Sequence, residues 1–183
     1  VAREQIQRVF LPIPGGFTIY NALCALSVGL CLGLRLSECA AALRSARGVK
    51  GRVEVVPVPT AYTVLIDYAH SPNALENILL TARDFTAGRL ICLFGCGGDR
   101  DRTKRPIMGS VVKELADLAV VTSDNPRTED PEDIIQDILA GMEGEGAQIH
   151  VEPDRRQAIA WALSQGRPGD VIVLAGKGHE TYQ

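Results

Sequence analysis

The sequence has little of what several protein classes require. Of its 183 residues only three are histidines and one is tryptophan, and aromatic residues make up 5%. Lysine and arginine number 19 against 22 acidic residues, which gives a formal net charge of −3 without any basic stripe. These counts argue against a nucleic-acid-binding surface and against a histidine-based metal site. We therefore expect no nucleic acid partner and no metal bound by these residues.

The cysteines lack the patterns of metal sites and disulfide frameworks. They number five, an odd count, and no C-x-x-C occurs. Each lies among apolar neighbours, at Cys24, Cys31, Cys39, Cys92 and Cys96. This distribution favours buried free thiols in a reducing cytosol. We expect a cytoplasmic protein.

A long membrane-spanning run is also missing. The most apolar stretch, Ile19 to Leu34, has 16 residues and contains Asn21 and Ser27. A membrane helix needs about 20 apolar residues, and the opening "VAREQIQRVFLPIPGG" is not a signal peptide. A helix that is apolar on nearly all sides predicts burial in protein rather than insertion into a membrane. The absent initiator methionine suggests a chain that begins inside a longer protein.

From Arg52 onward, short apolar runs alternate with amphipathic segments. Ser71, Asp130 and Asp154 are expected helix N-caps, and Pro72, Pro106 and Pro131 are expected near helix starts. The predicted strands are 62–69, 89–95, 117–123, 147–153 and 170–176, with helices at 71–85, 105–116, 131–142 and 154–166. This order predicts a doubly wound, Rossmann-like α/β fold with a mostly parallel sheet of about five strands. Residues 53–58 could pack at a sheet edge or serve as a connection. "RGVKGR" marks a domain boundary, so we expect one domain in residues 1–50 and another in 51–183.

Conspicuous polar clusters follow the predicted strands, where ligands of parallel sheets bind. They are the stretch after Asp67, "GCGGDRDRTKR", "SDNPR" and "GKGHE". One crevice could collect Asp67, His70, Arg100, Asn125, Arg127 and Glu180. An arginine can bind a carboxylate bidentately through its planar guanidinium group, and Glu180 can bind an ammonium group. The pattern suits a zwitterion such as an amino acid better than a polyanion.

Each cluster also has a structural interpretation. "GCGGDR" resembles a G-x-G-x-x-G loop, but Arg100 stands where the third glycine should be, so a tight turn explains it equally well. Asp67 could cap the following helix, and Arg127 could pair with Glu129 or Glu132 on the surface. "GKGHE" is not a P-loop, and "HETYQ" is not the H-E-x-x-H of a zinc enzyme. Singly these residues favour structural roles, whereas their convergence favours a site.

Four strings in order, "DYAHSPNALEN", "GCGGDRDRTKRP", "DNPRTEDP" and "AGKGHETYQ", resemble the Mur ligase family of peptidoglycan synthesis. The resemblance covers Arg52 to Gln183 and is closest to the members that add diaminopimelate. "YNALCALSVGLCLG" is similar to a helix at the end of the family's central ATPase domain. The resemblance therefore implies that residues 1–50 are a helical remnant of that ATP-binding domain.

The resemblance implies an ATP-dependent ligase that adds meso-diaminopimelate to UDP-N-acetylmuramoyl-L-alanyl-D-glutamate, with Mg²⁺ and an acyl phosphate. The implied amino-acid site comprises Arg100, Asp124, Asn125, Pro126, Arg127, Gly176 and Glu180. The implied nucleotide contacts are Asn21, Arg52, Asp67 and His70. The family's P-loop, magnesium ligands, modified lysine and UDP-binding domain have no counterpart in this sequence. We therefore assign no catalytic residue here, expect the missing amino-terminal and central domains as partners, and expect the chain alone to be inactive.

Two alternatives remain. Folylpolyglutamate synthetases share a D-x-A-H-x-P motif and would add glutamate, although "DNPR" and "GKGHE" argue against them. A non-catalytic domain that binds a nucleotide or an amino acid would also lack a P-loop. Within the ligase interpretation, Arg127 predicts diaminopimelate rather than lysine, because lysine has no distal carboxylate to pair with it.

Overall fold

The computed structural model describes residues 6–183, and the chain divides into two compact units between Gly48 and Val49. The first unit contains two helices, α1 (Phe17–Cys31) and α2 (Leu36–Arg44), which pack against each other. Gly29 of α1 makes this approach possible, because a Cβ there would lie 2.7 Å from the Cys39 sulfur. None of the described helices is both long and apolar enough to cross a membrane.

The expectation that α1 and all five cysteines are buried is wrong for part of the first unit. Within the described residues α1 buries only Thr18, Ala22 and Gly29. Cys24 and Cys31 are exposed, whereas Cys39, Cys92 and Cys96 are buried free thiols. The reason is that α2 covers one side of α1 and leaves its other apolar sides open.

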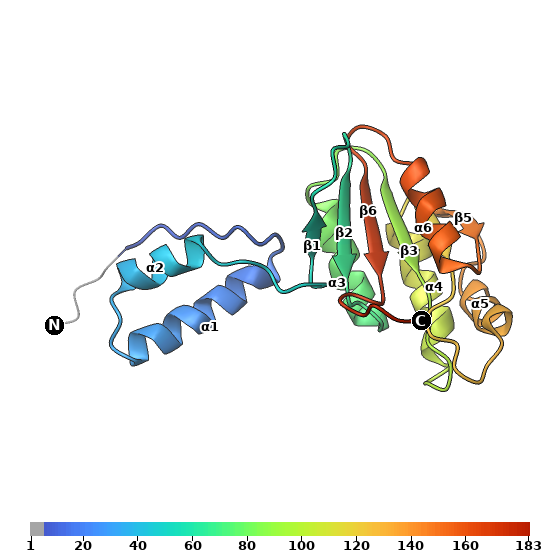
Figure 1. Cartoon of the computed structure of the whole chain (residues 1–183), viewed down its shortest axis with the longest axis horizontal. Coiled ribbons are helices and arrows are strands. Elements are labelled where there is room, and N and C mark those ends of the chain that lie inside the picture. Colours follow the sequence, from blue (N-terminus) through green and yellow to red (C-terminus); the bar gives the residue numbers. More distant parts are fainter. Residues whose placement is uncertain (1–5) are drawn as a thin grey trace. The chain divides into compact units, whose positions relative to one another are not determined.

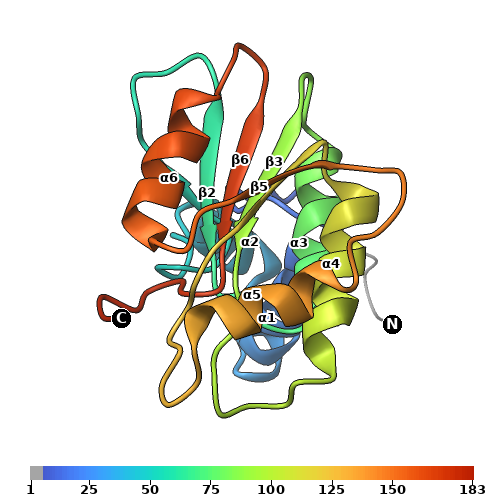
Figure 2. The same cartoon turned by 90° about the vertical axis from the view of Figure 1, so that its right-hand side faces the viewer.

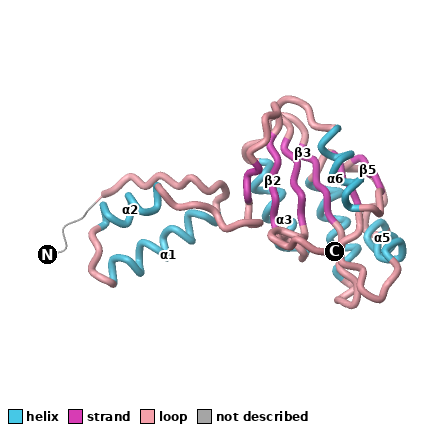
Figure 3. Tube along the Cα trace, viewed as in Figure 1, coloured by secondary structure: helices cyan, strands magenta, loops and turns pink. Residues whose placement is uncertain are grey.

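The second unit is a six-stranded sheet with helices on both faces (Figures 1 and 3). Its strands are β1 (Glu54–Val56), β2 (Thr63–Asp67), β3 (Leu90–Phe94), β4 (Leu118–Val121), β5 (Gln148–Val151) and β6 (Val171–Ala175). The strand order is β1-β2-β6-β3-β4-β5, and all neighbours are parallel except β1, which pairs antiparallel with β2. The doubly wound α/β prediction is confirmed, and residues 54–56 form the edge strand.

The helices are α3 (Pro72–Arg83), α4 (Lys104–Leu115), α5 (Pro131–Leu139) and α6 (Arg155–Ser164). Asp130 and Asp154 cap α5 and α6 as predicted, accepting hydrogen bonds from the backbone N–H groups of Glu132 and Gln157. The predicted proline near the start of α4 is confirmed, because the helix begins one residue before the predicted segment and places Pro106 in its first turn. A proline is tolerated there because the first N–H groups of a helix have no partner within it.

Two apolar layers enclose the sheet. Alternating side chains of β3 point to opposite faces: Cys92 packs in the cluster that includes α3, α4 and α5, while Ile91 and Leu93 pack in the cluster that includes α6. Figure 2 shows α6 on one side of the strands and α3 and α4 on the other. The apolar runs of β3, β4 and β6 are thus explained by burial on both faces.

The last strand of the unit lies in its interior. β6 pairs with β2 on one side and with β3 on the other. The loops that follow β2, β6, β3 and β4 therefore leave the same edge of the sheet in adjacent positions. This arrangement brings the four polar clusters of the sequence together.

Candidate amino-acid-binding site

A pocket of about 400 Å³ opens at this carboxyl edge of the sheet. All four loops contribute to it, and its lining consists of Tyr68, His70, Gly97, Arg100, Asp101, Lys104, Asp124, Asn125, Arg127, Gly176 and Glu180. Seven of these were singled out from the sequence: His70, Arg100, Asp124, Asn125, Arg127, Gly176 and Glu180. The crevice inferred from strand order is therefore present in the fold.

Four other predicted residues lie elsewhere. Pro126 is outside the lining, with its carbonyl oxygen facing Gly98. Arg52 stands over the Tyr68 ring, 5.0 Å from its centroid. Asn21 is exposed on α1, in the first unit. Asp67 is buried, and its Oδ2 accepts a hydrogen bond of 2.8 Å from the backbone N–H of Val53. Asp67 thus supports the bend before β1, where Val53 has a φ of 46°.

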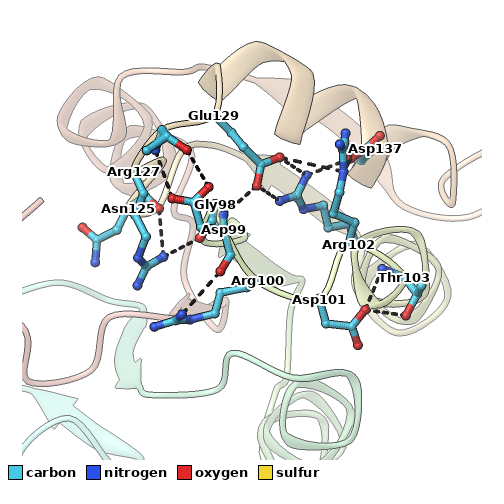
Figure 4. A network of polar contacts seen from close by, with 12 residues as sticks. Gly98, Asp99, Arg100, Asp101, Arg102, Thr103, Asn125, Arg127, Glu129 and Asp137 are labelled. Atoms are coloured by element: carbon cyan, nitrogen blue, oxygen red, sulfur yellow. Dashed lines mark hydrogen bonds and ion pairs between the residues drawn. The ribbon is translucent and has the colours of Figure 1, made fainter.

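The loops after β3 and β4 form one wall of the pocket (Figure 4). The N–H of Gly98 donates to the Asn125 carbonyl oxygen at 2.9 Å, and the Thr128 hydroxyl donates to Asp99 at 2.7 Å. Gly98 is required by space, because a Cβ would lie 1.8 Å from the Pro126 carbonyl oxygen. The glycines of "GCGGDR" therefore allow two loops to pack closely, as the structural interpretation of that motif proposed.

Arg127 lies on this wall in a left-handed backbone conformation, with a φ of 55°. Its Nη1 donates to the carbonyl oxygens of Gly98 at 2.8 Å and Asn125 at 3.3 Å. Among residues 6–183 it forms no ion pair with a carboxylate, so the alternative of surface pairing with Glu129 or Glu132 is wrong. The backbone holds the guanidinium at the pocket and leaves its charge uncompensated by an acid.

A buried arginine supports the same wall. Arg105, on α4, is fully buried and donates to Glu129 at 2.7 Å and to Asp137 at 2.8 Å. The hydrogen bond from Arg105 is the main reason that the pKa of Glu129 falls to about 2. Glu129 also accepts the N–H of Asp99, so this network connects α4 and α5 to both loops. Sequence reasoning missed Arg105, because its partners lie 24 and 32 residues away.

The opposite wall is formed by the stretch after β6. Glu180 accepts a hydrogen bond from the Tyr68 hydroxyl at 3.1 Å and another from the Asn125 amide at 3.3 Å. The bond to Glu180 also raises the pKa of Tyr68. Lys177 donates to the Asn125 side-chain oxygen at 2.9 Å, and its Nζ lies 3.4 Å from the Asp124 carboxylate. Neither Lys177 nor Tyr68 was assigned to the predicted site, although both lie inside motifs that the sequence made conspicuous.

The lining carries both signs of charge. Arg100, Lys104 and Arg127 are cationic, while the anionic residues are Asp101, Asp124 and Glu180. Lys104 is held in place by the His70 carbonyl oxygen, to which its Nζ donates at 2.8 Å. Among the residues the structure describes, no group of three histidine, cysteine, aspartate or glutamate side chains could hold a metal ion. The pocket is thus chemically suited to a small zwitterion with more than one carboxylate.

Comparison with known proteins places these features in a family. A family model described as "Mur ligase, glutamate ligase domain" matches residues 51–178. The chain is 49% identical over 175 residues to the UDP-N-acetylmuramoyl-L-alanyl-D-glutamate–2,6-diaminopimelate ligase of Clostridioides difficile (strain 630), covering 96% of this chain and 36% of that protein. It is 52% identical over 187 residues to the ligase of the same name from Clostridium botulinum, covering 100% and 38%. The chain thus spans little more than a third of these relatives.

Comparison with solved structures points to the same family. A structure of a UDP-N-acetylmuramoyl-L-alanyl-D-glutamate–2,6-diaminopimelate ligase superimposes with a TM-score of 0.74 at 40% identity, covering 96% of this chain and 36% of that one. A Mycobacterium tuberculosis folylpolyglutamate synthase complexed with ADP and AMPPCP gives a TM-score of 0.68 at 25% identity, covering 92% and 39%. The stronger likeness is to the diaminopimelate ligase.

Proposed function

Because the chain belongs to the Mur ligase family and carries its glutamate ligase domain, we propose that it binds the amino acid that an ATP-dependent ligase adds. The proposed amino acid is meso-diaminopimelate, and the proposed acceptor is UDP-N-acetylmuramoyl-L-alanyl-D-glutamate. The observation that supports this most directly is the pocket in which Arg127, uncompensated by an acid, shares the lining with Glu180. Relatives that bear this enzyme's name at about half identity support the same assignment.

Arg127 and Glu180 suit the two charged groups at the distal end of this substrate. Diaminopimelate carries a carboxylate and an ammonium group on its distal carbon, whereas lysine carries the ammonium alone. Arg127 would bind that carboxylate through two N–H groups, and Glu180 would accept hydrogen bonds from the ammonium beside it. Lysine would leave the arginine unpaired. Losing one hydrogen bond to a charged group costs roughly 1.5–3 kcal/mol, or about ten- to a hundredfold in affinity.

We propose that the nucleotide phosphates and Mg²⁺ are bound mainly by a part of the protein outside these residues. Neither a G-x-x-x-x-G-K-[ST] loop nor a cluster of metal ligands occurs among the described residues, so they do not fit ATP phosphates or Mg²⁺. We assign residues 1–50 to the end of a central ATP-binding domain that supplies this chemistry. Asn21, Arg52, Asp67 and His70 stay proposed nucleotide contacts, with Asp67 the weakest because its carboxylate is buried against Val53.

Calorimetric titration of the complete protein tests the substrate, with nucleotide and UDP-muramoyl dipeptide present. We expect wild type to bind meso-diaminopimelate about ten- to a hundredfold more tightly than lysine, and Arg127→Ala to abolish this preference. Arg102→Ala is the matched control, because Arg102 lies in the neighbouring loop, pairs with Asp137 and does not line the pocket. Equal binding of the two amino acids by wild type would reject the proposal.

Folylpolyglutamate synthase is the second candidate, because its solved structure superimposes on most of this chain. Glutamate is therefore included as a third ligand in the titration. Tighter binding of glutamate than of diaminopimelate would favour this candidate. Binding of an amino acid without turnover by the complete protein would favour a non-catalytic binding domain.

A further inference from the structure

Arg155 is a buried cation beneath the pocket that the proposed function does not use. It is the first residue of α6, and only 6% of its surface is exposed. Its Nη2 donates to the carbonyl oxygen of Ala175 at 2.7 Å, and its Nη1 donates to that of Ser123 at 3.3 Å. Both acceptors immediately precede pocket residues, Gly176 and Asp124.

The two carbonyl groups belong to strands that are not neighbours. Ala175 is the last residue of β6 and Ser123 follows β4, and β3 lies between these strands in the sheet. No ladder hydrogen bonds can therefore join β4 to β6. Helix α6 packs against β3, β4 and β6, so its first residue is placed to span the end of β3. One planar guanidinium thus links the bases of the two opposite pocket walls.

Stability alone gives a poor explanation for a cation at this position. The amino end of a helix carries partial positive charge, which disfavours a cation in the first turn. Burial lowers the pKa of Arg155, with the Asp124 carboxylate opposing that shift. Within the described residues Arg155 donates to backbone carbonyl groups and forms no ion pair. An apolar side chain would fill the same volume without burying a charge, and its cost would be the loss of the donor to the two carbonyl oxygens.

We propose that Arg155 is a positioning residue that fixes the distance between the "DNPR" wall and the "GKGHE" wall of the amino-acid pocket. The inference rests on the proposed function of that pocket. A ligand whose distal carboxylate pairs with Arg127 and whose neighbouring ammonium group pairs with Glu180 needs both walls at a set separation. Loss of Arg155 removes the link at the base of the walls and leaves their separation to the polar contacts that Lys177 and Glu180 make with Asn125. Amino-acid binding then weakens while nucleotide and acceptor binding are retained.

The test uses steady-state kinetics of the complete protein and compares Arg155→Met, Arg155→Lys and a control. Arg89 is the matched control, because it also donates to a backbone carbonyl, that of Gln165, but lies at the amino end of β3. We expect Arg155→Met to raise the KM for the amino acid by about tenfold or more, with the KM values for ATP and acceptor within about twofold. Arg155→Lys should raise the amino-acid KM less than Arg155→Met does, because an ammonium group keeps the charge but cannot donate to both carbonyl groups in the planar geometry of a guanidinium. Arg89→Met should lower the melting temperature without changing the amino-acid KM.

Each outcome decides the inference. An unchanged amino-acid KM in Arg155→Met, or an equal rise in Arg89→Met, would overturn it. If Arg155→Met does not fold, Arg155→Lys is used instead. An amino-acid KM equal to that of wild type in this variant would equally contradict a positioning role for the guanidinium. The measurements use whichever amino acid the wild type adds. A wild type without preference for diaminopimelate therefore refutes the proposed substrate and leaves the result on Arg155 interpretable.

Discussion

Three residues other than glycine adopt left-handed backbone conformations among the described residues: Val53, Asp99 and Arg127. Asp99 and Arg127 lie on the two packed loops of the pocket, and Val53 lies in the bend held by Asp67. Such conformations cost about 1–3 kcal/mol each and persist where surrounding contacts determine them. At the residue scale, two of the three strained backbone positions therefore lie on the loops of the pocket.

The Arg105–Glu129 pair makes the loops sensitive to acid. Glu129 has an ordinary pKa of 4.5 and a folded value of about 2, chiefly because Arg105 hydrogen-bonds to it. A carboxylate with a lowered folded pKa contributes stability that is present above pH 4.5 and is lost as the pH falls toward 2. We expect Glu129→Gln to be less stable than wild type at neutral pH and to lose less stability across that window. Urea unfolding at several pH values measures this, with the exposed Glu114→Gln as control. Parallel pH dependence in wild type and Glu129→Gln would contradict the expectation.

Individual site residues were predictable when their chemistry was visible locally. Arg127 and Glu180 stand in polar stretches directly after apolar strands, and strand order places such stretches at one edge. Lys177, Tyr68 and Arg105 were not assigned to the site, because their roles depend on partners far along the chain. Lys177 meets Asn125 across 52 positions and Tyr68 meets Glu180 across 112. No local pattern encodes such pairs.

At the scale of elements, the two pocket loops behave as one packed unit. Gly98 is the residue that allows this close packing. Glycine is required there because a Cβ would clash with the facing loop, and not because of its backbone conformation, since its φ is not left-handed. We expect Gly98→Ala to cost about 1–3 kcal/mol of unfolding free energy, as overpacking typically does, and to abolish amino-acid binding by displacing the "DNPR" backbone. Chemical denaturation and calorimetry measure the two effects.

Gly144→Ala is the matched control for this prediction. Gly144 has a φ of 83° and no atom within 4 Å of an added Cβ, so alanine there strains the backbone without touching a loop. The expected result is lower stability with unchanged affinity for the amino acid. Wild-type affinity in Gly98→Ala would show that the two loops bind ligand independently.

Element type was easier to predict from sequence than element boundaries. The caps Asp130 and Asp154 were predictable because a capping carboxylate acts on a neighbouring N–H group. The start of α4 was not, because Pro106 is compatible with any position in the first turn. The edge position of β1 depends on tertiary contacts, including Gly51, where a Cβ would lie 2.3 Å from the backbone N of His179.

At the scale of the whole molecule, the arrangement of strands was only partly predictable. A parallel sheet followed from the apolar runs, but the position of β6 between β2 and β3 follows from pairing across more than 80 residues. The exposed cysteines of α1 were mispredicted for a related reason: apolar character indicates a tendency to be covered, and it does not identify what covers a helix.

The 183-residue chain alone is expected to have no ligase activity. Its sequence has no phosphate-binding G-K-[ST] loop, and its described residues have no cluster of metal ligands. Phosphate release with ATP, meso-diaminopimelate and the UDP-muramoyl dipeptide measures this, with the complete protein as positive control. Turnover by the isolated chain would show that the nucleotide is activated by residues described above.

The interior position of β6 has a consequence for synthesis of the chain. Until residues 171–175 leave the ribosome, β2 and β3 have no strand to join them, and each presents an open edge. Until β6 has been synthesised, the nascent unit is therefore prone to intermolecular strand pairing at these edges. A premature stop at codon 171 would remove all of that strand, and we expect aggregation rather than a folded protein with an incomplete pocket.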